Sequence, residues 1–579
     1  MQLKHTLILA GSFFGLTSQA QVLSWADRLV SSGTPYSAAG TASVTDATTD
    51  PDGNSYVAGT FSDTLDIDPG PGVSQMISGN GYGDGFVAKF DPSGALIWAK
   101  HFASIQGSHF WFTDMALRPG NGVALCGQIS GTVDFDPSAN DHSFTSTSNG
   151  YCFVCALNGE GLFDWVDTWG TPWGYFNGSS MNSLDVDPAG NIAAAAQFRT
   201  GIDIDPGPGV QTMTGAAPGD AFLLRLSGTG DLLWGQQLSA SGGSNPTGVA
   251  VDAAGNAYIV GSCMDSIGSG SVYLPDPTPV GSNAFVMKFD ASGTAQWGYL
   301  VAGTGTNESY DAVDANSAGD VIIAGTLRGS ADIAPGPTVN TVAAPNPEPM
   351  LIGLDTDGGL RFSGALSISY EDNVGAYPYA VVIAENGDCA VTGDFDGTLS
   401  TGLFGGGEAL SYYFSGSDAF LAKYDSNGGV LYSGTVKGDG GNTGRAVAFD
   451  DLGNLFFAGS ISGTVDVDPG MPYVEVACPV QQGLLLKLGP DDSGVQSAAM
   501  APAFSLSPNP ANDQLWLTFP ENSATANVAV IDAEGRTVRT YPVGSVRSLV
   551  LDVHGLSPGV YHLRADGPQG RSVQRFVKD

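Results

Sequence analysis

The sequence predicts an all-β protein, a seven-bladed β-propeller followed by a small β-sandwich. Three observations predict it: a unit that recurs seven times, a composition rich in turn residues, and a change of pattern near residue 504. The chain has 579 residues, of which 82 are Gly and 33 are Pro, while 42% are hydrophobic and only 14% are charged. A disordered chain would be poorer in apolar residues, and a coiled coil richer in charge. The composition therefore favours a large, turn-rich β protein with a substantial core.

The recurring unit starts with a Gly-centred turn that precedes a β-rich run, as in Asp50–Gly59. In the D-x-x-G pattern, the Asp side chain caps a backbone N–H and Gly takes the left-handed position that closes a hairpin. A second run follows in each unit, most clearly Asp84–Phe90 and then Leu96–Lys100. Each unit is therefore expected to supply four short strands. The turn glycines are Gly53, Gly120, Gly190, Gly255, Gly319, Gly387 and Gly453.

Four antiparallel strands repeated seven times predict a propeller of seven blades over residues 21–494. Val22–Asp27 is similar to the fourth strand of the first unit, and the seventh unit ends after Leu484–Leu488 without such a strand. We therefore expect the first strand to complete the last blade, because this pairing hides two sheet edges at once. An open solenoid or a row of sandwiches is the alternative.

The repeats resemble the bacterial β-propeller repeats called SBBP, through the patterns G-N-x-Y-V-A-G and D-x-F-V-x-K-F-D. The resemblance implies the propeller fold. It implies no activity, because one propeller frame carries many functions.

The first twenty residues, Met1–Ala20, have the pattern of a secretory signal peptide. Lys4 supplies the positive charge, Leu7–Leu16 the apolar run, and Ser18 and Ala20 the small residues before the cleavage point. A buried element of the fold is the alternative. No other apolar run approaches the roughly 18 residues that cross a bilayer, so we expect an exported protein without a transmembrane segment.

The charge balance excludes two classes of partner. The chain has 21 Lys and Arg against 58 Asp and Glu, a formal net charge of −37. Such a surface repels phosphate backbones and anionic lipid headgroups. Binding to nucleic acid or to anionic membrane surfaces is therefore not expected.

Four units carry a D-x-D-P motif in the loop between their second and third strands. In an extended run, both carboxylates of the motif face one side, and hard oxygen ligands so placed can hold calcium. Calcium needs six or more oxygens, so the other interpretation is a solvated turn that Asp and Pro-Gly fix. The candidate calcium ligands are Asp66, Asp68, Asp134, Asp136, Asp203, Asp205, Asp466 and Asp468.

Loops between successive blades add aromatic residues to the same face of the predicted propeller. Exposed rings at these positions could stack on sugars, whereas buried ones would pack between neighbouring blades. The candidate ligand-binding residues are Trp111, Trp169, Trp173 and Tyr175.

The chain has six Cys, too few for a disulfide scaffold at this length. Cys152 and Cys155 stand three apart in a strand-like run and so face opposite sides, which suits neither zinc nor a redox turn. Cys126 and Cys155 occupy positions where other units have small residues. They are either small buried side chains or a cross-strand disulfide, which export would permit.

Catalytic motifs are missing from the sequence. It has no G-x-S-x-G, no H-E-x-x-H and no Gly-rich loop ending in G-K. His101, His109 and His142 are too dispersed for a triad. We therefore predict that the protein is not an enzyme.

Residues 495–503 are expected to form a linker, and residues 504–579 a small β-sandwich. This segment opens with P-N-P-A-N-D, continues with D-A-E-G-R and L-S-P-G-V-Y, and ends in F-V-K. It resembles the type A C-terminal sorting domain of the type IX secretion system. The resemblance implies transport by that machinery to the outer-membrane surface of a Gram-negative bacterium, or release. An ordinary accessory sandwich is the alternative.

Together these features predict an exported binding or adhesion protein that recognises a glycan or another extracellular partner, with calcium as a candidate cofactor. Two alternatives stay open. One is a hydrolase or lyase that acts on extracellular polysaccharide. The other is a structural surface protein whose acidic surface maintains solubility.

Overall fold

The computed structural model divides the chain into two compact units, Met1–Asp491 and Asp492–Asp579. It describes residues 21–32, 40–70, 72–78, 83–105, 108–146, 150–170, 180–199, 201–215, 219–276, 281–301, 303, 308–335, 339–369, 374–403, 409–411, 416–469, 474–490, 505–507, 511–524, 527–531, 537–542, 545–557, 559–567 and 570–578. The signal peptide and the linker expected from the sequence lie outside these residues. No helix in the described part of the chain is long and apolar enough to span a membrane.

In the first unit, the described residues form seven groups of four antiparallel strands, which we call blades 1 to 7 in chain order. The innermost strands are β2 (Ala42–Thr49), β8 (His109–Arg118), β14 (Ser180–Val186), β20 (Ser244–Val251), β26 (Ser309–Ala315), β31 (Gly375–Ile383) and β37 (Thr443–Phe449). The second strands are β3 (Ser55–Phe61), β9 (Gly122–Ser130), β15 (Ile192–Phe198), β21 (Ala257–Met264), β27 (Val321–Asp332), β32 (Cys389–Asp396) and β38 (Leu455–Asp466).

The third strands are β6 (Asp84–Phe90), β12 (Tyr151–Leu157), β18 (Asp220–Leu226), β24 (Ser282–Phe289), β28 (Thr341–Leu354), β35 (Asp418–Tyr424) and β39 (Glu475–Pro490). The outermost strands are β7 (Leu96–Phe102), β13 (Phe163–Gly170), β19 (Leu232–Ala240), β25 (Ala295–Val301), β29 (Leu360–Ala365), β36 (Val430–Gly438) and β1 (Gln21–Ser32). Short outer strands are β4 (Thr64–Asp66), β5 (Gln75–Ile77), β10 (Thr132–Asp134), β11 (Ser143–Thr145), β16 (Ile202–Asp203), β17 (Thr212–Met213), β22 (Ile267–Ser269), β23 (Val272–Leu274), β30 (Ser367–Ser369), β33 (Thr398–Ser400) and β34 (Ala409–Ser411).

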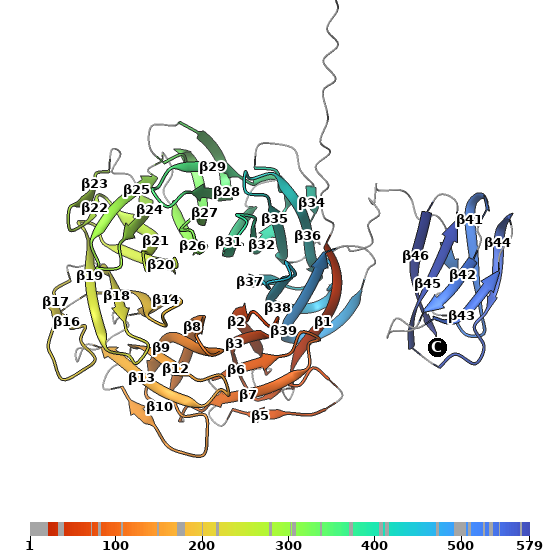
Figure 1. Ribbon diagram of the computed structural model, residues 1–579, viewed down its shortest axis with the longest axis horizontal. Coiled ribbons are helices and arrows are strands. Elements are labelled where there is room, and N and C mark those ends of the chain that lie inside the picture. The colour runs from red at the N-terminus through yellow and green to blue at the C-terminus, as the bar shows by residue number, and fades with distance from the viewer. Residues whose placement is uncertain are drawn as a thin grey trace, which may run out of the picture. The chain divides into compact units, whose positions relative to one another are not determined.

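The blades are arranged in a closed ring. The innermost strands follow one another around an axis, and β37 of blade 7 lies beside β2 of blade 1 (Figure 1). The first strand, β1, pairs antiparallel with β39, with Trp25 opposite Lys487 and Leu29 opposite Gly483. The first strand therefore completes the last blade, as predicted, and the all-β propeller prediction is confirmed.

In three units, the D-x-x-G turn is held by a polar cluster that joins the two sequence motifs of the unit. In blade 1, Asp50 Oδ1 accepts hydrogen bonds from the backbone N–H and the side-chain amide of Asn54, and Gly53 closes the turn at φ 80°. Lys89 of the third strand lies 3.1 Å from Asp50 Oδ2. The equivalent pairs are Asp187 with Arg225 and Asp450 with Lys487.

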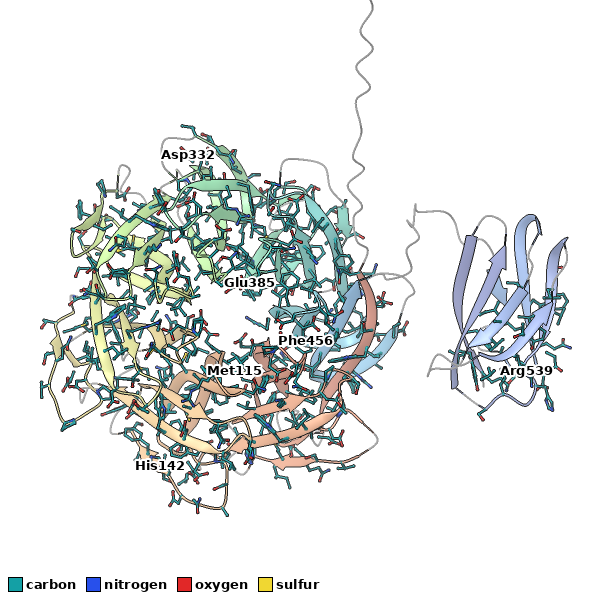
Figure 2. All side chains as sticks on the ribbon, viewed as in Figure 1. Met115, His142, Asp332, Glu385, Phe456 and Arg539 are labelled. Carbon is teal, nitrogen blue, oxygen red and sulfur yellow. The ribbon has the colours of Figure 1, made fainter. Side chains whose placement is uncertain are left out.

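Indole side chains of the outermost strands connect neighbouring blades. Trp25 Nε1 donates to the carbonyl oxygen of Pro92 in a turn of the next blade, at 3.1 Å. The same bond links Trp98 to Gly159, Trp165 to Gly228, Trp234 to Ala291 and Trp297 to Thr356. The recurring Trp is thus a contact between blades, with a bonded N–H as buried indoles require. Side chains fill the spaces between the blades, with Met115 beside the axis and His142 and Asp332 at the outer rim (Figure 2).

The second unit is a β-sandwich, as predicted. One sheet contains β40 (Ser505–Ser507), β41 (Gln514–Ala524) and β44 (Ser545–Asp552), and the other contains β43 (Thr537–Pro542), β42 (Asn527–Ile531), β45 (Gly559–Gly567) and β46 (Gly570–Lys578). Alternating apolar residues of both sheets form one core, which includes Leu517, Val530 and Phe576.

Candidate functional site: the axial cavity of the propeller

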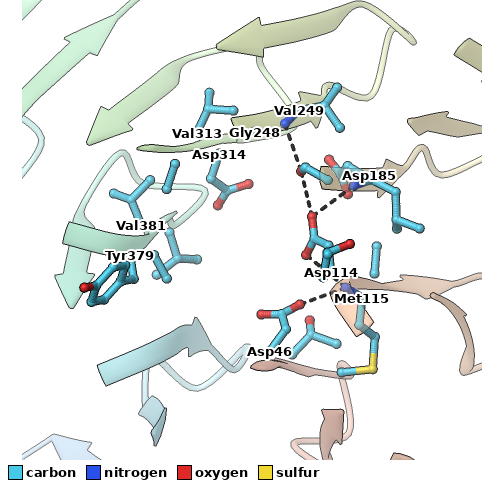
Figure 3. Close-up of a pocket in the computed structure, with 18 of the residues that line it drawn as sticks. Asp46, Asp114, Met115, Asp185, Gly248, Val249, Val313, Asp314, Tyr379 and Val381 are labelled. Carbon is cyan, nitrogen blue, oxygen red and sulfur yellow. Dashed lines mark hydrogen bonds between the residues drawn. The ribbon is translucent and has the colours of Figure 1, made fainter. Parts of the chain in front are cut away.

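A cavity of about 390 Å³ lies on the axis of the ring, and all seven innermost strands line it (Figure 3). Its polar lining includes Asp46, Asp114, Asp185, Tyr379 and Arg445. The site therefore combines residues from repeats that are far apart in the chain.

Each innermost strand has a β-bulge at the same point of its pairing with the second strand. The extra residue on the innermost strand belongs to the cavity wall in every blade. A bulge leaves one residue unpaired and redirects its side chain, so the repeated bulge builds a ring of side chains around the axis. Its members are Thr45, Thr113, Asn182, Thr247, Asp311, Tyr379 and Arg445.

The residue after the bulge joins neighbouring blades in one half of the ring. Asp46 Oδ2 accepts a hydrogen bond from the backbone N–H of Met115 in the next blade at 3.0 Å, and Asp114 Oδ2 accepts one from Leu184 at 2.9 Å. Ser183 Oγ accepts one from Val249 at 3.0 Å. An innermost strand is a sheet edge whose axial N–H groups have no strand partner, and these side chains supply the missing acceptor.

Two further carboxylates repeat this arrangement two residues farther along their strands. Asp185 Oδ2 accepts from the backbone N–H of Val251 at 2.7 Å, and Asp314 Oδ2 accepts from Ile383 at 2.8 Å. Each acceptor lies on one blade and each donor on the next, so these bonds also tie the blades together near the axis.

The crowded strands raise the pKa values of the carboxylates around the axis. Burial raises the pKa of Asp185 to about 7 and those of Asp311 and Asp314 to about 6. Burial and then the charge of Asp114 raise the pKa of Asp46 well above its usual range. The side-chain hydrogen bond to Asp114 raises the pKa of Asp46 further.

The side of the cavity formed by blades 6 and 7 has an aromatic and a basic side chain in place of carboxylates. The guanidinium carbon of Arg445 lies 4.4 Å from the ring centroid of Tyr379, a cation–π contact. Arg445 is exposed and makes no ion pair with any residue that the structure describes. Among the lining residues it is the single basic side chain. Burial and then the charge of Asp394 raise the pKa of Tyr379 to about 12, so its hydroxyl keeps its proton.

Two exposed aromatic rings lie on innermost strands, outside the residues that line the cavity. Trp111 is 43% exposed and Tyr377 is 41% exposed, and each stands two residues before a bulge residue of its strand, Thr113 and Tyr379 respectively. The ring of His109 stacks on Trp111, with centroids 5.0 Å apart. Trp111 has the exposure that the sequence-based hypothesis requires. The sequence reasoning missed Tyr377, Tyr379 and Arg445, although Tyr379 and Arg445 each stand eight residues before the turn glycine of their unit, which was a usable signal.

Trp169 is not available to a ligand, so its prediction as an exposed ring is wrong. It is 2% exposed, and its Nε1 donates to the carbonyl oxygen of Ile204 in the next blade at 3.1 Å. Trp169 thus packs between blades, the alternative that the sequence left open. Trp173 and Tyr175 lie outside the described residues.

The D-x-D-P motifs lie on outer hairpins and not in the cavity. Asp66 Oδ1 accepts from the backbone N–H of Asp68 at 3.3 Å and of Ser74 at 2.9 Å, which fixes the loop. Asp332, whose motif lacks the second carboxylate, makes equivalent bonds. Among the residues described, no three His, Cys, Asp or Glu side chains are grouped as metal ligands. The first Asp also fixes the loop in Asp134–Asp136, Asp203–Asp205 and Asp466–Asp468.

The disulfide between Cys126 and Cys155, one of the two alternatives that the sequence left open, is not formed in the structure. In the pairing of β9 with β12, Cys126 lies opposite Val154, whereas Cys155 lies opposite Leu125. Neighbouring positions on a strand face opposite sides of the sheet, so Cys126 packs towards blade 3 and Cys155 towards blade 1. All six thiols are free and buried, which matches the alternative of small buried side chains.

Comparisons with known proteins agree with both units. Residues 505–579 match the family model described as a secretion system C-terminal sorting domain, and residues 233–262 match the model described as a beta-propeller repeat. No curated protein matches the chain.

Two solved extracellular domains from B. thetaiotaomicron cover nearly the whole chain at low similarity. That of the putative one component system BT4673 is 10% identical, covers 95% of this chain and 99% of its own, and gives a TM-score of 0.16. That of the putative hybrid two component system BT3049 is 9% identical, covers 92% and 97%, and gives 0.16. TM-scores this low carry no argument, so the fold rests on the strand pairings and the repeat match.

Proposed function

Because the chain is a β-propeller protein that a type IX sorting domain sends to the cell surface or the medium, we propose that it binds an extracellular glycan in its axial cavity. The observation that carries the proposal is the cavity itself, about 390 Å³ in volume, with a polar ring from seven strands and, two residues before two of the ring's members, the exposed rings of Trp111 and Tyr377. Pockets of this size suit small ligands. Aromatic faces stack on the apolar faces of sugars, while polar side chains bond their hydroxyls.

The experiment is a glycan array with the purified full chain, followed by calorimetry on the glycans retained. Trp111→Ala and Tyr377→Ala are expected to weaken binding by about tenfold, the usual scale of a lost aromatic contact. Tyr273→Ala is the matched control, because Tyr273 is 67% exposed on an outer hairpin. Absence of binding to any glycan, or binding that neither rim variant weakens, would contradict the proposal.

One observation favours a second function, an enzyme that acts on polysaccharide. The pKa values of Asp46 and Asp114 are both raised within the cavity, and pairs of carboxyl groups with displaced pKa values can provide an acid and a base. Incubation with polysaccharides, with assays for new reducing ends and for unsaturated products, tests this function. Activity that Asp114→Asn abolishes at unchanged melting temperature would support an enzyme. The absence of products from every polysaccharide would leave binding.

A further inference from the structure

The two halves of the axial cavity differ at the residue that follows the bulge. In blades 1 to 3 this residue is Asp46, Asp114 or Ser183, each of which accepts a hydrogen bond from the next blade. In blades 4 to 7 the position carries a residue with no polar side chain. These residues are Gly248, Ala312, Ala380 and Ala446.

The missing side chains leave backbone donors uncovered. The N–H of Asp450 bonds to the carbonyl of Asn454, and bonded and non-bonded pairs alternate along an antiparallel ladder. Val447, three residues earlier, is therefore in a non-bonded pair, and its N–H is directed to the axis.

Val313 stands three residues before Asn316, and Val381 three residues before Ala384, whose N–H groups make the equivalent turn bonds. The N–H groups of Val313 and Val381 are therefore also directed to the axis. Within the described part of the chain, no side chain accepts a hydrogen bond from these three axial N–H groups. Their equivalent in blade 4, Val249, bonds to Ser183.

A side chain at the position of Gly248 would lie close to the N–H group of Val313 in the next blade. A Cβ atom built on Gly248 would stand 3.3 Å from the backbone nitrogen of Val313. The hydrogen bonds drawn in Figure 3 run along Asp46, Met115, Asp114 and Val249, and none is drawn at Val313 or Val381 on the far side of the cavity.

The carboxylates of the cavity, by contrast, already accept hydrogen bonds. Asp46, Asp114, Asp185 and Asp314 each accept at least two hydrogen bonds, and Asp311 accepts from the hydroxyls of Ser309 and Thr326. The N–H groups of Val313, Val381 and Val447 have no side-chain acceptor among the described residues, and the Arg445 guanidinium, which lies against Tyr379, forms no salt bridge there. A ligand that brings oxygen acceptors can therefore bond to this side of the cavity.

We propose that the side of the cavity formed by blades 5 to 7 binds the carboxylate of an acidic sugar, through Arg445 and the N–H groups of Val381 and Val447. A carboxylate has two oxygens with about four acceptor sites and pairs well with a guanidinium. The inference rests on the proposed function, since it specifies the class of glycan, and makes uronic-acid oligosaccharides the ligand.

The experiment compares matched ligands on the full chain by calorimetry. The probes are trisaccharides of galacturonic, glucuronic and mannuronic acid and the same trisaccharides with each carboxyl group reduced to an alcohol. At least one acidic probe is expected to bind about tenfold or more tightly than its reduced form, the scale of a lost charged hydrogen bond. Arg445→Gln is expected to remove this difference.

A second variant tests the backbone donors independently of the guanidinium. Ala380→Ser places a hydroxyl where Ser183 stands in blade 3, so it should cover the N–H of Val447 and weaken binding of the acidic probe several-fold. Ala446→Ser is the matched control, because the N–H group that it faces, that of Ala47, already bonds to Asp46.

The outcomes separate this inference from the proposed function. Equal affinity for acidic and reduced probes, or acid selectivity that survives both Arg445→Gln and Ala380→Ser, overturns the carboxylate site while glycan binding stands. If no glycan binds the chain, both proposals fail. Acid selectivity that Arg445→Gln and Ala380→Ser reduce, and that Ala446→Ser leaves intact, supports the site.

Discussion

Lys89 Nζ lies 3.1 Å from Asp50 Oδ2, and the two side chains are almost fully buried. They belong to two motifs that look independent along the chain, the D-x-x-G-N turn and the D-x-F-V-x-K strand. Burial raises the pKa of Asp50, but hydrogen bonds from Asn54 and the charge of Lys89 outweigh it and hold the value below its usual range. The same pairing in Asp450 and Lys487 shows that the two motifs form one structural unit.

Removing one partner of this pair should destabilise the propeller strongly. Lys89→Met leaves a buried carboxylate without its cation, which costs about 3–5 kcal/mol in comparable pairs. Thermal unfolding of the full chain measures the loss. Adding Asp50→Asn to Lys89→Met should recover much of it, because the uncompensated charge is then gone. An unchanged melting temperature in Lys89→Met would show that the pair contributes little.

The carboxylates around the axis predict an unusual pH dependence of stability. Burial raises the pKa of Asp185 to about 7 and that of Asp314 to about 6, so between about pH 4 and pH 7 the folded protein binds protons that the unfolded chain has released. Stability from these groups is therefore present at low pH and lost as the pH rises through this range. We expect the melting temperature to fall between pH 5 and pH 8.

Asp185→Asn should flatten this profile and raise the melting temperature at pH 8, because the amide oxygen still accepts from Val251 without a charge to desolvate. Asp451→Asn, in an exposed turn, is the control and should leave the profile unchanged. The lowered pKa values of Asp50 and Asp450 act only below about pH 4, where protonation removes their stabilisation. A melting temperature that rises from pH 5 to pH 8 would contradict the assignment.

The six cysteines should resist thiol reagents in the folded protein. All are buried, and burial raises the pKa of Cys152 to about 12, so the reactive thiolate is scarce. Maleimide at neutral pH should leave the native chain unlabelled and add six labels in denaturant, as measured by intact mass. If the native mass is two hydrogens lower and a reductant decreases the melting temperature, the chain contains a disulfide, and the pair Cys126 and Cys155 becomes the candidate again.

The D-x-D-P loops should depend on their first carboxylate more than on their second. Asp66 holds the loop through Ser74, eight residues on, whereas Asp68 bonds Gly70 within the turn. Asp66→Ala should therefore lower the melting temperature more than Asp68→Ala. The expected difference in the free energy of unfolding is about 1 kcal/mol, the contribution of one lost hydrogen bond. Calcium is expected to leave both values unchanged. A calcium-dependent increase that Asp68→Asn abolishes would instead establish a metal site.

Much of the architecture was visible in the sequence because local chemistry specifies it. Gly53 and Asp50 mark a turn by themselves, and Trp25 marks a fourth strand that lacks its own blade. The site was less visible. Tyr379 and Arg445 become cavity residues through a bulge that exists only in the pairing of two strands. Trp169 is buried because Ile204 of the next blade accepts its N–H, a contact between blades that no local pattern contains.

The antiparallel pairing of β1 with β39 affects the order in which the propeller folds. It joins Trp25 to Lys487 across nearly the whole propeller, so the final blade stays one strand short until the front of the chain returns to it. The entropic cost of joining such distant segments grows only slowly with chain length, but contacts so remote in sequence form slowly. Six blades can therefore form from strands that are consecutive in the sequence. The seventh is complete only when an intact first strand pairs with β39, so we expect it to form last.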